Sequence, residues 1–252
     1  MAALLAAVGG FLDAFTYFGH GQVFANAMSG NVVLLGAFAA SRQWNQALRH
    51  VLPIAAFLFG VAAAQLPRLR AIRESVPDPA LASLAAEFGF LVAAGWYPNH
   101  LPDYPLVLGI SFVAALQSSS FARVHNCSYS STVTTGNLRH FGETAFKAFF
   151  QPPDSEAMYQ TRVFGAVCLA FLAGATAGGV CVRQMQNMSL WLASIPLSIA
   201  GILLLRDRSE AASTAAQINI PVAIIGTALM ASAVPTRFDG RQPSCTPTRH
   251  ER

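Results

Sequence analysis

The chain has 252 residues, of which 54% are hydrophobic and only 11% are charged, against roughly 25% charged residues in an ordinary soluble domain. Its mean hydropathy is +0.45, which excludes a disordered protein and argues against a soluble enzyme, because so few charges could not cover its surface. The formal net charge of +4 includes no basic run of five residues, so no nucleic-acid partner is expected. The composition therefore predicts an integral membrane protein with helical spans.

Apolar segments that approach the length needed to cross about 30 Å of hydrocarbon follow one another along the chain. In chain order, these segments are 1–18, 23–40, 51–66, 80–96, 105–121, 131–150, 163–182 and 190–205. The first, second and sixth are weaker than the others because they contain polar side chains, among them Asp13, Asn31 and Glu143. Polar groups at membrane depth are costly, so we expect these side chains to face protein or water rather than lipid.

The charges of the connecting loops predict an orientation. Segment 67–79 contains three arginines, whereas 98–104 and 151–158 contain no lysine or arginine. By the positive-inside rule, 67–79 is expected in the cytoplasm and the other two outside, which places Arg183 inside. This assignment requires the second and sixth apolar segments to cross the membrane completely, since a re-entrant segment would change the parity.

The C-terminal residues 207–252 differ in character from the rest of the chain. They are richer in charge and end in a stretch without apolar periodicity, which is expected to be disordered. Within them, 218–234 is apolar and forms a marginal candidate for an extra span. The sequence thus predicts a membrane domain over 1–206 followed by a C-terminal tail.

Self-similarity between the two halves of the chain indicates an internal duplication. M-S-G-N at 28–31 is followed five residues later by a glycine, and T-T-G-N at 134–137 is followed by a glycine at the same distance. A second pair of similar segments, at 56–60 and 170–174, follows in the same order. Gly174-x-x-x-Gly178, after the last of these, is a signature of close helix packing.

We therefore expect an all-α, polytopic helical membrane protein with two sequence-related repeats, 3–96 and 105–205. Each repeat is expected to hold about four helical segments, with broken or short helices at the Gly-Asn motifs. Four crossing segments per repeat would make the repeats parallel and three would make them inverted, and the number of apolar segments favours four. Duplicated membrane units are a known plan for transporters, whose site lies between the repeats.

Several of these motifs resemble the YoaK family of bacterial inner-membrane proteins. The motifs are G-F-L-D-A, M-S-G-N-V-V-L-L-G, A-L-Q-S-S, T-T-G-N-L and A-F-L-A-G. The resemblance covers residues 3–206 and implies a multi-pass inner-membrane protein without an established activity. The chain departs from the family at Ser118-Ser119, where the family more often has Asn-Ala, and in the tail after Arg206.

The candidate binding residues belong to the two Gly-Asn motifs and to polar positions upstream of them. Ser, Thr and Asn can cap a helix that starts inside the membrane, and the positive end of that helix suits a carboxylate or another small anion. The candidate substrate-binding residues are Asp13, Ser29, Gly30, Asn31, Gln117, Ser118, Thr135, Gly136 and Asn137. We expect Asp13, Asn31, Gln117 and Asn137 to converge on one polar cavity. The alternative is that these residues only hold helices together, with Asp13 capping a broken helix near 19–21.

Two carboxyl groups within apolar segments are candidates for proton or ion coupling. Asp13 and Glu87 both lie within apolar segments, where an ionisable group is costly. The usual enzyme fingerprints are missing, and the four cysteines have no C-x-x-C spacing, so we expect neither an enzyme nor a metal site nor a cofactor.

The favoured hypothesis is a small-molecule permease or channel-like carrier of the inner membrane, that is, a transporter with a polar site between two repeats. Its expected partners are the lipid bilayer and a small polar or carboxylate-bearing substrate, and a homo-oligomer stays open. The alternative is a non-transporting membrane assembly or stress-related protein whose polar motifs serve helix packing. A water-accessible cavity that reaches Asp13 would favour the first hypothesis.

Overall fold

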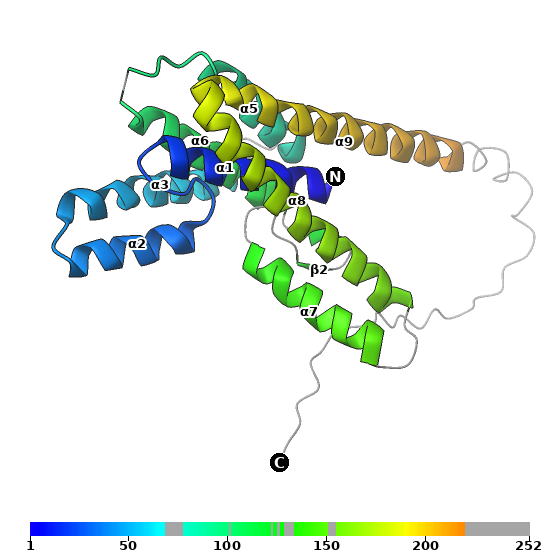
Figure 1. The fold of residues 1–252 in the computed structure, drawn as a ribbon. Helices are drawn as coiled ribbons and strands as arrows, with labels where there is room; N and C mark the ends of the chain where they lie inside the picture. Colours follow the sequence, from blue (N-terminus) through cyan, green and yellow to red (C-terminus); the bar gives the residue numbers. More distant parts are fainter. Residues whose placement is uncertain are drawn as a thin grey trace, which may run out of the picture. The chain divides into compact units, whose positions relative to one another are not determined.

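The computed structural model describes residues 1–68, 78–100, 102–121, 123–124, 127–128, 134–150 and 155–219. Apart from a short strand pair, β1 (Arg123–Val124) with β2 (Cys127–Ser128), the described elements are helices. The helices are α1 (Ala2–Gly19), α2 (Met28–Ala40), α3 (Trp44–Ala63), η1 (Leu66–Arg68), α5 (Pro79–Ala94), α6 (Tyr104–Ser120), α7 (Thr134–Phe150), α8 (Ser155–Met185), η2 (Gln186–Ser189) and α9 (Leu190–Asn219) (Figure 1). The expected all-α class is confirmed.

The chain divides into two compact units, Met1–Arg206 and Asp207–Arg252. The described part of the second unit is the end of α9, up to Asn219. Most of the apolar segment 218–234 therefore lies outside the described residues. The site discussed below belongs entirely to the first unit.

Several helices of the first unit have the length and apolar character of membrane spans. Ala2–Gly19, Trp44–Ala63 and the stretch Ser155–Ala211 are long and apolar enough to cross a membrane, whereas α2, α5 and α6 are apolar but shorter. At 1.5 Å per residue, the 13 residues of α2 extend over about 20 Å, less than the roughly 30 Å of a hydrocarbon core.

Two hydrogen bonds identify the end of this unit at which several helices meet. His20, directly after α1, lies 2.8 Å from the carboxylate of Asp103, directly before α6. Asn187, between α8 and α9, donates a 2.9 Å hydrogen bond to the carbonyl of Tyr97, which follows α5. Thus α1, α5 and α8 end here, and α6 and α9 begin here. We name this the Tyr97 end.

The chain turns back on itself between α1 and α2. After α1 reaches the Tyr97 end, the non-helical residues 20–27 return along it, so that the Asn26 amide reaches Asp13 and the Asn26 side chain reaches the carbonyl of Gly9. Asp13 lies six residues before the end of α1, which is about 9 Å along the helix axis. The short helix α2 therefore begins partway along α1.

Helix α7 is placed in a similar way along α8. The ring of His140 stacks on Phe164 at 5.1 Å, and Thr135 lines a cavity together with Phe171 of α8. The two helices are therefore antiparallel, as Figure 1 also shows. Because Phe171 lies 14 residues before the end of α8, α7 begins partway along α8.

These positions overturn the predicted orientation of two loops. Helix α8 has 31 residues and ends beside Tyr97, so its first residue, Ser155, lies at the opposite end, about 45 Å away. Arg183, two residues before the end of α8, lies near the Tyr97 end. The prediction that 98–104 shares a side with the region around Ser155, and lies opposite Arg183, is therefore wrong. The reason is that α2 and α7 begin partway along their neighbours, so they do not extend from one end of this unit to the other as the prediction assumed.

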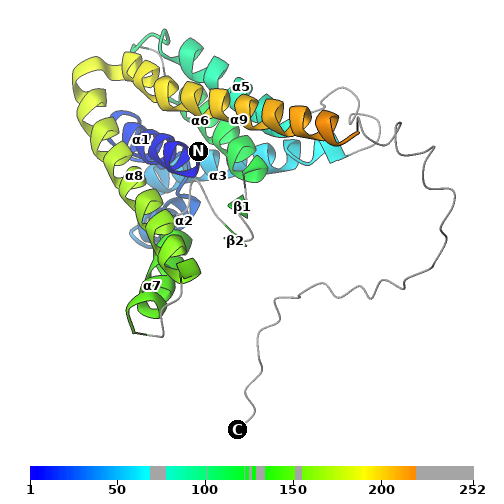
Figure 2. The ribbon, with the colours of Figure 1, turned by 90° about the vertical axis from the view of Figure 1, so that its right-hand side faces the viewer.

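Glycines bring two pairs of helices into backbone contact. A Cβ atom on Gly174 or Gly178 of α8 would collide with the backbone of α1, and a Cβ on Gly60 of α3 would collide with α6. Helix α1 accordingly packs along α8, as Figure 2 shows, and α3 packs along α6. The packing role predicted for Gly174-x-x-x-Gly178 is confirmed.

The distribution of polar and apolar side chains is the reverse of that in a water-soluble protein. Large apolar side chains such as Phe59, which is 72% exposed, and Leu169, which is 68% exposed, cover the outer faces of α3 and α8. Meanwhile several polar side chains lie inside the unit: Asp13, Asn26, Asn31, His50, Glu87 and Gln117 are all buried. Such a large apolar perimeter would be a liability in water.

Candidate functional site

A cavity of about 530 Å³ lies where α2 and α7 begin. Its walls come from α1, the returning segment 20–27, α2, α3, α7 and α8, so both halves of the chain contribute. The lining residues are Asp13, Ala14, Tyr17, Phe18, Phe24, Asn26, Ala27, Met28, Ser29, Phe57, Thr134, Thr135, Phe171 and Ala175. We name it the Asp13 cavity.

The carboxyl group of Asp13 holds the start of α2. Its Oδ1 accepts hydrogen bonds from the backbone N–H groups of Asn26, at 2.7 Å, and Ala27, at 3.2 Å. Ala27 is the N-cap residue of α2 and provides no side-chain cap. Asp13 of α1 therefore supplies the acceptor that a Ser or Asp at the N-cap would normally supply, and it lies at the positive end of the α2 dipole.

Three oxygen atoms of the lining residues have no hydrogen-bond partner within the described part of the chain. They are Oδ2 of Asp13, Oδ1 of Asn26 and Oγ1 of Thr134. The side chains of Asp13 and Asn26 are only 5% and 1% exposed. Buried polar atoms are nearly always paired with protein, water or a ligand, and these three oxygens all belong to residues that line the Asp13 cavity.

The rest of the cavity wall is mainly aromatic. Five aromatic side chains line it: Tyr17, Phe18, Phe24, Phe57 and Phe171. The rings of Tyr17 and Phe24 stack at a centroid distance of 4.9 Å. No lysine or arginine is found among the described lining residues. The guanidinium of Arg183 lies 5.2 Å from the ring centroid of Phe18, but Arg183 does not belong to the lining.

The structure brings some of the predicted binding residues together in this cavity. Asp13, Ser29 and Thr135 all line it. Gly30 lies behind the wall, since a Cβ added there would come within 2.9 Å of the Phe24 ring. Gly136 has open space around the position of an added Cβ.

Asn31 is engaged in holding the returning segment. Its Oδ1 accepts the N–H of Phe24 at 3.0 Å, and its Nδ2 donates to the carbonyl of Phe24 at 2.7 Å. The same Oδ1 lies 3.2 Å from Nδ1 of His50 in α3. Asn31 is fully buried and satisfies both backbone groups of a non-helical residue, which is the packing role that the sequence left as the alternative.

Gln117 and Glu87 form a separate buried pair between α6 and α5. The Gln117 Nε2 donates a 2.6 Å hydrogen bond to Oε2 of Glu87, and Oε1 of Glu87 has no partner within the described residues. Ser118 donates to the carbonyl of Ala115, one turn earlier in its own helix, at 3.1 Å. Asn137 is buried in α7.

The expected convergence of Asp13, Asn31, Gln117 and Asn137 on one cavity is wrong, because only Asp13 lines the Asp13 cavity. Asn31 is used by the returning segment and Gln117 by Glu87. Sequence reasoning also missed Asn26 and His50 as polar partners, although a polar residue two positions before the first Gly-Asn motif was a usable signal for Asn26.

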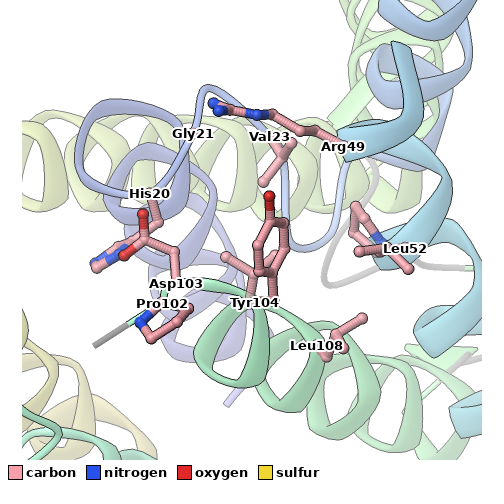
Figure 3. A pocket seen from close by; sticks show the side chains of 11 residues that line it. His20, Gly21, Val23, Arg49, Leu52, Pro102, Asp103, Tyr104 and Leu108 are labelled. Carbon is pink, nitrogen blue, oxygen red and sulfur yellow. The ribbon is translucent and has the colours of Figure 1, made fainter. Parts of the chain in front are cut away.

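A second, smaller cavity of about 220 Å³ lies at the Tyr97 end (Figure 3). His20 and Asp103 form its polar side through their 2.8 Å contact, and Arg49 and Tyr104 reach it from α3 and α6. Gly21 has a φ of +83°, a value that glycine adopts readily, and it forms the turn with which the chain leaves α1. The first residues of α3 therefore lie at the Tyr97 end as well.

Comparisons with known proteins identify the family of this chain. The UPF0700 transmembrane protein YoaK of Bacillus subtilis (strain 168) is 23% identical over 196 residues, which cover 76% of this chain and 87% of that relative. No solved structure matches the chain. The family described as "Protein of unknown function (DUF1275)" matches residues 1–203. The chain therefore belongs to the DUF1275 family.

Proposed function

We propose that this protein is a multi-pass inner-membrane transporter of small polar solutes. The membrane location is supported by the apolar perimeter and by the helices long enough to cross a bilayer. The B. subtilis relative is also named a transmembrane protein. Non-helical backbone at membrane depth, such as residues 20–27, is tolerated where it is buried in protein or lines a cavity. Here the returning segment does both.

The proposal includes two repeats of opposite orientation. In the first half, α1, α2 and α5 end at the Tyr97 end and α3 begins there. In the second half, α6 and α9 begin at that end, α8 ends there, and α7 runs away from it. Each helix thus runs opposite to its counterpart, which favours inverted repeats over the parallel repeats suggested by the number of segments. Inverted repeats with broken helices are a common transporter plan.

Reciprocal packing supports the same duplication. Gly174 and Gly178 of α8 contact the backbone of Ala7 and Phe11 in α1. In the other half, Gly60 of α3 contacts Phe112 in α6. The third helix of each half therefore packs on the first helix of the other half. The first residues of α2 and α7, Met28 and Thr134, are also the first residues of the two similar motifs.

The observation that carries the transport proposal is the Asp13 cavity. Two helices, one from each half, begin at this cavity, and three of its lining residues carry a buried oxygen without a partner among the described residues. Transporters with inverted repeats place their substrate at such helix breaks, close to the middle of the membrane. A cavity of about 530 Å³ falls in the range of roughly 300–1,000 Å³ that is typical of small-molecule sites.

An uptake screen would test the proposed function. Purified protein in liposomes is incubated with a mixture of polar metabolites, and the contents of the liposomes are analysed by mass spectrometry. We expect uptake of at least one solute by the native protein and its loss in Asp13→Asn. Glu156→Gln, at the exposed start of α8, removes a carboxylate outside the cavity and should leave uptake unchanged.

The alternative function is a membrane assembly or stress-related protein that transports nothing. The closed contacts of Asn31 with Phe24 and of Gln117 with Glu87 favour it, because they show polar residues used for packing. This alternative predicts no uptake of any solute and no labelling of a cysteine placed at Ser29 by a water-soluble thiol reagent. Labelling of Ser29→Cys together with uptake would exclude it.

A further inference from the structure

The free polar atoms of the Asp13 cavity are hydrogen-bond acceptors. When Asp13 is ionised, its Oδ2 can act only as an acceptor, and the amide Oδ1 of Asn26 is always an acceptor. The hydroxyl of Thr134 can accept as well. A ligand that satisfies these three oxygens has to bring donors. A primary ammonium group has three N–H donors, which equals the number of lining oxygens that lack partners among the described residues.

The cavity is poorly suited to the carboxylate that the helix starts first suggested. The N–H groups at the start of α2 already bind Oδ1 of Asp13, so this chain's own carboxylate takes the place that an anionic substrate would need. A second carboxylate there would face Asp13 without a lysine or arginine in the described lining. Two carboxylates in one small cavity repel each other strongly where the local dielectric constant is low.

The aromatic wall favours an organic cation over a metal ion. The five aromatic side chains of the lining present ring surfaces to the same space as the carboxylate, and cations are attracted to the faces of aromatic rings. A bare alkali ion would leave most of the 530 Å³ unfilled, whereas an alkyl or aryl group attached to the ammonium would pack against the rings.

We infer that the Asp13 cavity binds a primary organic amine in its protonated form. The ammonium group bridges Asp13, Asn26 and Thr134, and its apolar part lies among the aromatic rings. This inference rests on the proposed function, because it names the substrate class of the same site. It replaces the carboxylate-bearing substrate with a cationic one.

The test is calorimetric titration of the purified full-length protein in lipid nanodiscs. The probe is butylammonium chloride, and three relatives of it separate the chemistry: butan-1-ol lacks the charge, tetramethylammonium lacks the N–H donors, and butyrate reverses the charge. Sodium chloride at the same ionic strength tests a simple cation. We expect butylammonium to bind at least about tenfold more tightly than each of the others, since hydrogen bonds to charged groups are the strong ones.

Variants connect the binding to the named atoms. Asp13→Asn should weaken butylammonium binding at least about tenfold, because it removes the carboxylate. Thr134→Val removes a hydroxyl that has no partner among the described residues, so it should weaken binding with little effect on folding. Phe57→Leu keeps an apolar wall and should weaken binding about two- to fivefold by removing a ring face. Phe149→Leu, at an exposed position of α7, is the matched control and should change nothing.

Butanol or butyrate binding as tightly as butylammonium would overturn the inference, as would full affinity in both Asp13→Asn and Thr134→Val. Absence of butylammonium binding to the folded native protein would also overturn it. The uptake screen then distinguishes failure of the amine inference from failure of the transporter proposal. Uptake of a neutral or anionic solute that Asp13→Asn abolishes would leave the transporter proposal standing while the amine assignment fails, and uptake of no solute would remove both.

Discussion

At the scale of single residues, the polar side chains of the apolar segments have two different roles: some line the Asp13 cavity and others hold the backbone or a neighbouring side chain. Asp13, Ser29 and Thr135 could be selected because polar side chains in apolar segments need a partner or water, and all three line one cavity. Asn31 was selected by the same reasoning but bonds the backbone of Phe24. Its partner lies in a non-helical segment whose path depends on tertiary contacts, and no local pattern records that path.

The double hydrogen bond of Asn31 predicts a large loss of stability on truncation. Asn31→Ala leaves the partly buried N–H and carbonyl of Phe24 without their Asn31 partners, so we expect it to cost about 2 kcal/mol. Thermal unfolding in detergent measures this loss. Asn45→Ala, at an exposed position near the start of α3, is the matched control, and an equal effect of the two substitutions would refute the structural role of Asn31.

The buried pair of Glu87 and Gln117 leads to a different expectation. In Glu87→Gln an amide oxygen still accepts the hydrogen bond from Gln117, and Glu87 does not line the Asp13 cavity. We therefore expect unchanged amine affinity and only a modest change in stability. Glu87→Leu should be more destabilising, since it leaves the Gln117 amide unpaired. Loss of binding in a well-folded Glu87→Gln variant would show that Glu87 contributes to the site.

At the scale of elements, helix existence was predictable and helix extent was not. The apolar segments predicted in 51–66, 80–96 and 105–121 overlap α3, α5 and α6. In contrast, the segment predicted over 23–40 contains only the 13-residue helix α2. Its first residues belong to the returning segment 20–27, which lies beside α1. The hydrogen bonds that stabilise that path come from Asp13, ten or more residues earlier, and a local apolar pattern does not reveal them.

Replacing a helical glycine with alanine should stabilise or destabilise the protein according to the atoms that surround the added methyl group. Gly174→Ala places a methyl group against the backbone of Ala7 in α1 and should destabilise the protein by about 1–3 kcal/mol through overpacking. Gly36→Ala, in α2, meets no atom within 4 Å and should be neutral or stabilising by up to about 1 kcal/mol, because alanine favours helix. Chemical or thermal unfolding of both variants would decide, and equal effects would contradict the tight contact of α1 with α8.

At the scale of the whole first unit, class was predictable from composition and topology was not. The low charge and high apolar content indicated helical spans, and the described elements are helices with an apolar perimeter. The number of crossings depends on α2 and α7, two short helices whose sequences are compatible with complete or partial crossing. One misjudged segment reverses the side assigned to every later loop, which is why the prediction that Arg183 and 98–104 lie on opposite sides was wrong.

Cysteine labelling in intact cells would test the revised topology. In a background without native cysteines, Asn99→Cys and Gln184→Cys should both react with a membrane-impermeant thiol reagent from the outside, since both residues lie near the Tyr97 end. Ser155→Cys, at the opposite end of the 31-residue α8, should react only after the cells are opened. Labelling of Gln184→Cys and Ser155→Cys from the same side would contradict the arrangement.

Under the proposed duplication, the two halves differ at one chemically decisive position. Asp13 in α1 is an acid that holds the start of α2, whereas Gln117, the polar residue of α6 that the duplication proposal pairs with it, is an amide engaged with Glu87. In a carrier with inverted repeats, the outward-open and inward-open forms arise when the halves exchange conformations. Halves that differ in an acid cannot exchange at equal energy, so such a carrier has a preferred resting orientation when empty. Its direction of net transport would then be sensitive to whatever stabilises or releases the hold of Asp13 on α2.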